Sequence, residues 1–154
     1  MHSQTYVPIA QRYAGYTKYE PRLSRGLRDY QSLGFSIKRQ DWPMVAAAVV
    51  PIEQGIMATP TVDALLKAGL LAPQMLVSPN NLRERRDVAL ATFYVNEVDF
   101  AIREIRKAAS VRDAEAAMAA WQFGADSWNS YLSVINPRIV PKVGEPLEPI
   151  QTRL

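Results

Sequence analysis

Residues 80–109, NNLRERRDVALATFYVNEVDFAIREIRKAA, decide the fold predicted for this chain. Apolar residues recur in this stretch at spacings of three and four from Leu90 to Ile105, while most charged residues fall between them. Asn81 followed by Glu84 has the form of a capping box, which predicts where a helix begins. A helix of this length spans about 42 Å and can bury its apolar stripe only against other long helices.

Three further helices are predicted around this one. The first covers residues 21–39, where Pro21 is suited to a first helical turn, and the fourth covers residues 110–135, capped by Ser110 with Asp113. A second helix is expected over residues 41–69, ending near Gly69, and its prolines should interrupt it between positions 51 and 59 because proline cannot donate a helical hydrogen bond. Residues 72–80 are then expected to form a loop.

The two ends of the chain lack a helical period. Residues 1–19 hold four of the seven tyrosines and are predicted to form an extended arm that packs over the bundle or lies on a partner. Tyr6 and Tyr13 are the candidate partner contacts, whereas Tyr16 and Tyr19 are expected to pack on the bundle. Residues 137–154 contain four prolines, which favours an extended tail. The fold prediction is therefore an all-α, antiparallel up-down four-helix bundle over residues 20–136, with an arm before it and a proline-rich tail after it.

The composition excludes most common catalytic and metal chemistry. There is no cysteine, and the single histidine is His2, so thiol nucleophiles, thiolate sites and His-based catalysis are not expected. Glu97 and Asp99 lie in the long helix without the Glu-x-x-His pairs of a bundle di-metal site, and Trp121 and Trp128, seven residues apart, are predicted to be core. No glycine-rich phosphate loop occurs. We therefore expect no catalytic residue, no metal and no cofactor.

Charge is the main functional signal. Residues 1–41 contain seven Lys or Arg and three Asp or Glu, a balance of +4, so that the rest of the chain carries −1 of the total of +3. This asymmetry favours an acidic partner, although a solvated face explains it equally well. Basic residues are interleaved with acids and no recognition motif is present, so nucleic acid is not the expected partner. The candidate contacts are Arg22, Arg25, Arg28, Arg83 and Arg86.

Several short runs resemble the PsbQ-like extrinsic proteins of photosystem II. They begin with Tyr19-Glu-Pro-Arg-Leu, Gly26-Leu-Arg-Asp-Tyr30 and Asp41-Trp42, and continue with Asn80-Asn-Leu before an arginine-rich turn, Asn96-Glu-Val-Asp99, Tyr131-Leu and Val143-Gly144. The resemblance covers about residues 15–150 and consists mainly of structural positions. The proline-broken second helix and the tyrosine-rich arm look more like the divergent members found in algae with red-lineage plastids.

The resemblance implies a non-catalytic extrinsic subunit on the lumenal side of the chloroplast thylakoid membrane. Such a subunit docks on the photosystem II core and other extrinsic subunits and stabilises the oxygen-evolving side without binding its cluster. No stretch is long and apolar enough for a transmembrane segment, and a targeting segment would already have been removed. The alternatives are a helical peripheral subunit of another photosynthetic or membrane complex, such as photosystem I, and a soluble ligand-binding bundle or enzyme.

Overall fold

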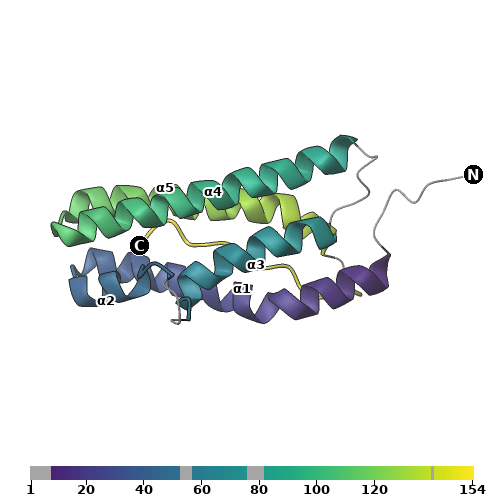
Figure 1. The fold of residues 1–154 in the computed structure, drawn as a ribbon, viewed down its shortest axis with the longest axis horizontal. Helices are drawn as coiled ribbons and strands as arrows, with labels where there is room; N and C mark the ends of the chain where they lie inside the picture. Colours follow the sequence, from purple (N-terminus) through teal and green to yellow (C-terminus); the bar gives the residue numbers. More distant parts are fainter. Residues whose placement is uncertain (1–7, 53–56, 76–81, 140) are drawn as a thin grey trace, which may run out of the picture.

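A computed structural model describes residues 8–52, 57–75, 82–139 and 141–154, and within them the chain is helical without strands. The elements are α1 (Ile9–Lys38), α2 (Trp42–Ala48), α3 (Pro60–Met75), α4 (Leu82–Ser110), α5 (Ala114–Ile135) and the short 3-10 helix η1 (Asn136–Arg138). Helices α4 and α5 form one closely packed pair, and α1 and α3 form another (Figure 1). The all-α prediction is confirmed for the described residues.

Two aromatic residues join α1 to α5 in the core. The Tyr30 hydroxyl donates a hydrogen bond of 2.8 Å to the Trp121 carbonyl, and the Trp121 indole N–H donates one of 2.8 Å to the Tyr30 carbonyl. Their rings stack with centroids 5.7 Å apart. Trp121 and Trp128 are both fully buried, which confirms the prediction that they belong to the core.

Tight approach of the helices requires glycine at one core position. A Cβ atom on Gly124 of α5 would overlap the Tyr30 hydroxyl and lie 2.8 Å from the Cβ of Ala101 on α4. Only a residue without a side chain lets three helices meet here. Two turns further along α5, the buried Tyr131 hydroxyl donates a hydrogen bond of 2.7 Å to the Ala68 carbonyl of α3, so α5 is tied to α3 as well.

The extended arm predicted for residues 1–19 is wrong from Ile9 onward. Helix α1 begins at Ile9, and residues 1–7 lie outside the described residues. Tyr16 and Tyr19 precede Leu23 by seven and four positions, so they continue the apolar stripe of α1 and are buried. Pro21 is inside α1 instead of starting it. The proline frees the carbonyl of Thr17, which is solvent-exposed, so water can satisfy it.

The predicted break in the second helix is confirmed, with shifted boundaries. Helix α2 ends at Ala48, several residues before Pro51, and α3 begins with Pro60 in its first turn. However, α3 does not end near Gly69: it continues through Pro73 to Met75, which is fully buried. The loop prediction for residues 72–80 is therefore wrong over 72–75, and residues 76–81 are outside the described part. Burial of Met75 and Leu71 outweighs the helix-breaking tendency of Pro73.

Two helix ends use the same turn. Gln40 after α1 and Arg112 after α4 have positive φ angles of 56° and 55°, and each precedes an aspartate that caps the next helix. The Asp113 side chain accepts from the Ala116 N–H at 3.0 Å, whereas Ser110, the predicted cap, is the last residue of α4. Asn81 lies outside the described residues, so the capping-box prediction stays untested.

The tail after η1 is extended, as predicted, but it is part of the bundle. It runs along the side of the molecule formed by α1 and α5 (Figure 1). Its apolar residues are buried against these helices, namely Ile139, Val143, Leu147 and Ile150. The tail thereby covers apolar surface that two helices alone would leave exposed.

Candidate docking surface

The arginines of α1 are exposed along the outside of the helix. Arg22, Arg25 and Arg28 are all solvent-exposed, and none makes an ion pair or hydrogen bond with the residues that the structure describes. Surface charges of this kind contribute little to folding stability. They remain available to an acidic surface, as the sequence predicts.

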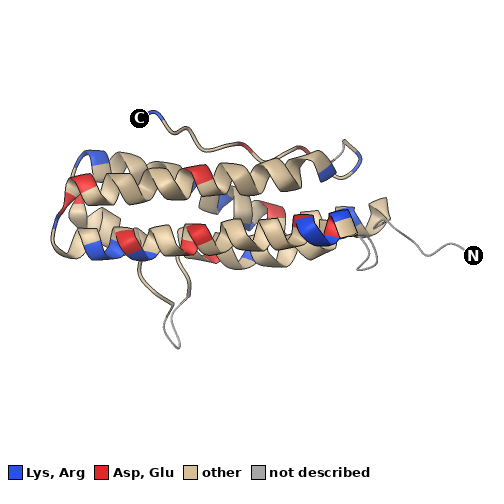
Figure 2. Ribbon diagram, turned by 90° about the horizontal axis from the view of Figure 1, so that it is seen from above, with Lys and Arg blue, Asp and Glu red and all other residues tan. Residues whose placement is uncertain are grey.

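The second arginine group lies at the N-terminal end of α4. Arg83 and Arg86 are exposed there and alternate with acidic residues (Figure 2). The neighbouring acids turn toward the bundle, since Arg138 pairs with Glu84 at 2.6 Å and with Asp87 at 3.1 Å. Positive side chains at a helix N-terminus are opposed by the helix dipole. Folding therefore gives no reason for arginines here.

The two arginine groups do not form a single patch. Helix α1 packs mainly on α3, α5 and α2, and α4 packs mainly on α5, α3 and α2, so α1 and α4 lie across the bundle from each other. The pairing of helices, which separates the two groups, cannot be deduced from the spacing of residues along one chain. A flat partner surface can contact one group at a time.

The tyrosines expected to contact a partner have different positions. Tyr6 lies outside the described residues. Tyr13 is on α1 and is 53% exposed, while Tyr16 and Tyr19 are buried, as expected for residues that pack on the bundle. Among the tyrosines of α1, only Tyr13 therefore presents its ring to solvent.

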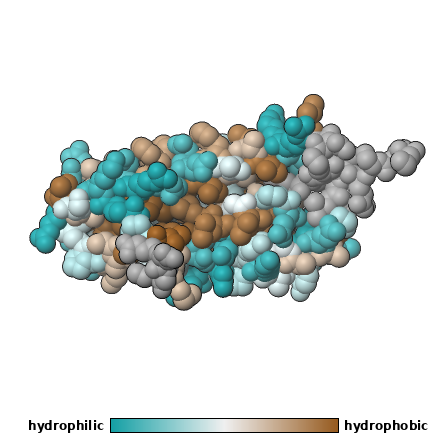
Figure 3. All heavy atoms as spheres, viewed as in Figure 1, coloured by the Kyte–Doolittle hydropathy of each residue, from teal (hydrophilic) through white to brown (hydrophobic). Residues whose placement is uncertain are grey.

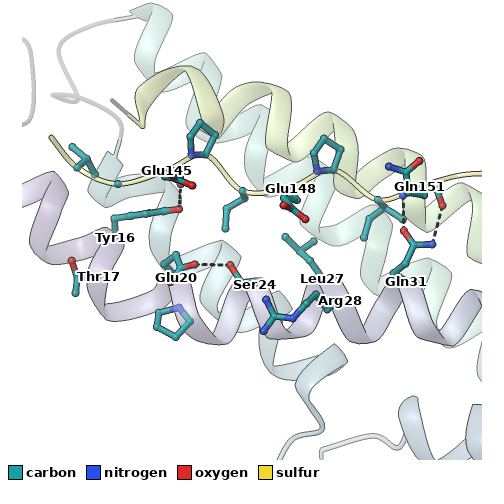
Figure 4. A pocket seen from close by; sticks show the side chains of 17 residues that line it. Tyr16, Thr17, Glu20, Ser24, Leu27, Arg28, Gln31, Glu145, Glu148 and Gln151 are labelled. Carbon is teal, nitrogen blue, oxygen red and sulfur yellow. Dashed lines mark hydrogen bonds between the residues drawn. The ribbon is translucent and has the colours of Figure 1, made fainter. Parts of the chain in front are cut away.

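A groove of about 630 Å³ lies between α1 and the tail, and we call it the tail groove (Figure 4). Three side-chain amides fasten the tail, each by bonding both the N–H and the C=O of one tail residue. Gln31 holds Gln151 at 2.6 and 3.0 Å, Asn129 holds Ile150 at 2.8 and 3.0 Å, and Asn136 holds Leu147 at 2.9 Å in both bonds. A carboxamide has the donor and the acceptor of a peptide unit, so it satisfies an extended backbone that has no helical partner.

The tail groove is more polar than the core. The Tyr16 hydroxyl donates to the Glu145 carbonyl, and Ser24 donates to the Glu20 carboxylate at 2.7 Å. Burial, together with the nearby carboxylates of Glu20 and Glu145, raises the pKa of Tyr16 to about 12. Arg28, one of the predicted docking residues, lines this groove, so it faces the acidic tail side as well as solvent.

Sequence reasoning missed a second concave region. A cavity of about 510 Å³, which we call the α2 pocket, lies between α1, α2 and the start of α3. Phe35 and Met44 stand at its edge and are 42% and 56% exposed. Both residues fall off the apolar stripes of their helices, and that mismatch is the signal that could have indicated an apolar surface.

Apolar side chains also gather along the middle of the face that carries α3 and α4 (Figure 3). On α3, Leu66 and Leu70 are each about half exposed. Gly69 between them has no atom within 4 Å of an added Cβ, so packing does not require glycine at this place. This face is therefore open to solvent at both leucines.

Two structural findings, on metal ions and on membranes, apply to the described residues. Among them, no group of three or more acidic or histidine residues is placed to hold a metal ion, and no helix has the length and apolar character needed to cross a membrane. Asp99, one of the two acids considered in the long helix, forms an ion pair with Arg103 at the surface of α4.

Comparison with known protein families, curated proteins and solved structures finds no match to this chain.

Proposed function

We propose that the protein is a non-catalytic peripheral subunit of a photosynthetic membrane complex, with photosystem II as the first candidate. In this proposal it resides in the chloroplast thylakoid lumen, docks on the lumenal domains of the membrane core and stabilises the oxygen-evolving side. The resemblance to PsbQ-like proteins supports the assignment. The bundle is then best described as an up-down four-helix bundle of α1, α3, α4 and α5, with α2 as an insertion between the first two.

A single observation carries the docking role. Arg22, Arg25 and Arg28 are exposed on one helix and have no ionic partner among the described residues. An acidic surface would attract all three together, and salt would screen that attraction. Arg83 and Arg86 provide a second, separate contact at the far side of the bundle, and Tyr13 provides a further contact on α1. Tyr6 stays a predicted contact outside the described residues.

Fractionation of the cells that make the protein tests this proposal. The protein should sediment with photosynthetic membranes, be released by high salt, and rebind to the stripped membranes when salt is lowered. Mass spectrometry of the complex that carries it separates photosystem II from photosystem I. A protein that stays in the soluble fraction at low salt would instead support a free-standing ligand-binding bundle or an enzyme.

A charge-reversal variant tests the docking face itself. Changing Arg22, Arg25 and Arg28 to Glu should leave melting nearly unchanged and lower the salt concentration that releases the protein. The matched control changes Lys107, Lys142 and Arg153 to Glu, which are also exposed and give the same change in net charge. Equal release of both triple variants would show that only net charge matters and that the α1 face is merely solvated.

A further inference from the structure

The α2 pocket has a closed floor and an apolar edge. Leu33, Ser36 and Thr61 form the buried floor, with 2%, 4% and 2% of their surfaces exposed. Ala47 of α2 lines one wall, and Phe35 and Met44 form the edge. The volume of about 510 Å³ lies within the range of ligand-binding cavities. The pocket can accept at least one bulky side chain together with its neighbours.

The interior of the pocket offers little to a charged group. The Ser36 hydroxyl already donates to the Ser32 carbonyl at 3.3 Å, and Thr59 donates to the Ala48 carbonyl at 2.9 Å. A charge placed there would lose its water without gaining a strong partner. The group that enters is therefore apolar.

The surroundings of the pocket carry charges of both signs. Asp29 and Arg39 lie at its two ends, ten residues apart on α1 and its C-cap, or about 15 Å along a helix. Arg25 comes one turn before Asp29, which is the only acid of α1 after Glu20, and the Asp41 carboxylate caps α2 by accepting from the Met44 N–H. Arg25 and Arg39 make no ion pair with described residues. A partner segment that crosses this region is favoured if it carries acidic groups opposite these two arginines.

We propose that the α2 pocket binds a bulky apolar side chain, such as Phe or Leu, carried by an acidic segment of the partner on which the protein docks. Identification of that partner as the membrane complex rests on the proposed function. Arg25 and Arg39 attract the acidic segment, and the pocket fixes its position. Interfaces concentrate their binding energy in such buried anchors, whereas exposed charges at the rim mainly affect the association rate.

Binding of synthetic peptides to the whole protein tests the pocket directly. The probe is a short fluorescent peptide of Asp, Glu and Ser with one central Phe, and its twins carry Ala at the centre or Lys in place of the acids. We expect fluorescence anisotropy to show the acidic Phe peptide binding about tenfold more tightly than either twin, as expected for loss of a buried anchor. Ala47→Trp fills the pocket and should remove the preference for Phe.

Phe35→Asp provides a second variant that does not depend on tolerance of a tryptophan in α2. Because Phe35 is exposed, this change should preserve the melting temperature while removing the Phe preference. The control is Phe100→Asp, since Phe100 is 54% exposed and its ring contacts Phe123 of α5, away from the pocket. Phe100→Asp should bind the peptides like the parent.

Four outcomes would overturn the proposal. They are equal affinity for the Phe and Ala peptides, a Phe preference that survives in both pocket variants, self-association of the parent that Ala47→Trp abolishes, and binding to phosphatidylcholine vesicles that Ala47→Trp abolishes. The third would assign the pocket to a second copy of the chain, and the fourth to a lipid chain. Membrane rebinding without a peptide preference contradicts the pocket alone, whereas a peptide preference without membrane rebinding contradicts the proposed function alone.

Discussion

The tail groove and the α2 pocket are two concave regions along α1, and among the described residues only the tail groove has an extended segment of the chain as one of its walls. In the tail groove, Gln31, Asn129 and Asn136 satisfy the extended backbone of the tail, while Leu147 and Ile150 bury their side chains. In the α2 pocket, the walls are helices whose backbones are already bonded, and Phe35 and Met44 stay exposed. An extended segment packs stably along helices when side-chain amides bond its backbone and its apolar residues reach buried sites. No described segment is held in this way over the α2 pocket.

The largest effect is expected in the core on which the tail rests. Trp121→Ala and Trp128→Ala should each lower the free energy of unfolding by roughly 3–5 kcal/mol, because each removes a fully buried ring. Trp121→Ala should also loosen the tail, since the Trp121 ring lies against Gly34 and close to Leu154. Denaturant unfolding measures both variants, and near-native stability of either would show that these rings are not held in the core.

The next effect tests whether the tail is a structural part of the fold. Leu147→Ala should destabilise the protein by about 2–4 kcal/mol, because it empties a buried anchor site. Glu148→Ala, one residue further and solvent-exposed, is the matched control and should change stability by less than about 0.5 kcal/mol. Equal stability of the two variants, measured by thermal unfolding, would mean that the tail contributes nothing to the bundle.

Tyr16 provides a test of the tail groove by pH. Its pKa is raised in the folded protein from 10.0 to about 12, so its contribution is fully present below pH 10 and is lost as the pH rises toward 12. Tyr16→Phe should cost about 1 kcal/mol at neutral pH by removing the bond to the Glu145 carbonyl. It should also flatten the loss of stability between pH 10 and 12. The residual loss belongs to Tyr30 and Tyr131, whose pKa values burial also raises.

An unchanged slope of stability against alkaline pH in Tyr16→Phe would show that Tyr16 is not buried by the tail. Tyrosinate absorbance during the titration provides a second measurement, because Tyr16→Phe should remove absorbance that the parent gains only as the pH approaches about 12.

The smallest effect is expected at the edge of the α2 pocket. Met44→Ala should change the free energy of unfolding by less than about 0.5 kcal/mol, because Met44 is more than half exposed and supports nothing in the bundle. Met44→Ala and Leu147→Ala together compare the α2 pocket with the tail groove by the loss in free energy of unfolding that each variant causes. A loss of more than about 2 kcal/mol at Met44 would place this residue in the core and remove the argument that the pocket is kept open for a partner.

Much of the fold could be predicted from the period of apolar residues. The stripes of Leu23 to Ile37, Val98 to Ile105 and Trp121 to Ile135 are buried as the spacing indicates. The errors arose where a residue type has two meanings. The arm prediction places Tyr16 and Tyr19 over the bundle as part of an extended segment, although their spacing continues the stripe of α1 and puts them in the helix. The loop prediction rests on Pro73, although helix α3 passes through it.

The candidate site was predicted less completely. Exposure of Arg22, Arg25, Arg28, Arg83 and Arg86 follows from the stripes, because residues off the apolar face point to solvent. Their separation into two groups depends on which helices pack together, and a single sequence contains no record of that pairing. The α2 pocket was missed for the same reason, since its walls come from three helices.

The sequence by itself determined the helical class, the apolar face of each long helix and the excess of positive charge in the first 41 residues, because periodicity and composition act locally. Only the tertiary structure decided that the tail lies in a groove of its own bundle, that the two arginine groups lie apart and that a pocket opens beside α2. These features depend on contacts between residues far apart in the chain, such as Asn129 with Ile150 and Gln31 with Gln151. Such contacts form because the packed helices bring side-chain amides beside an extended backbone whose N–H and C=O groups need hydrogen-bond partners.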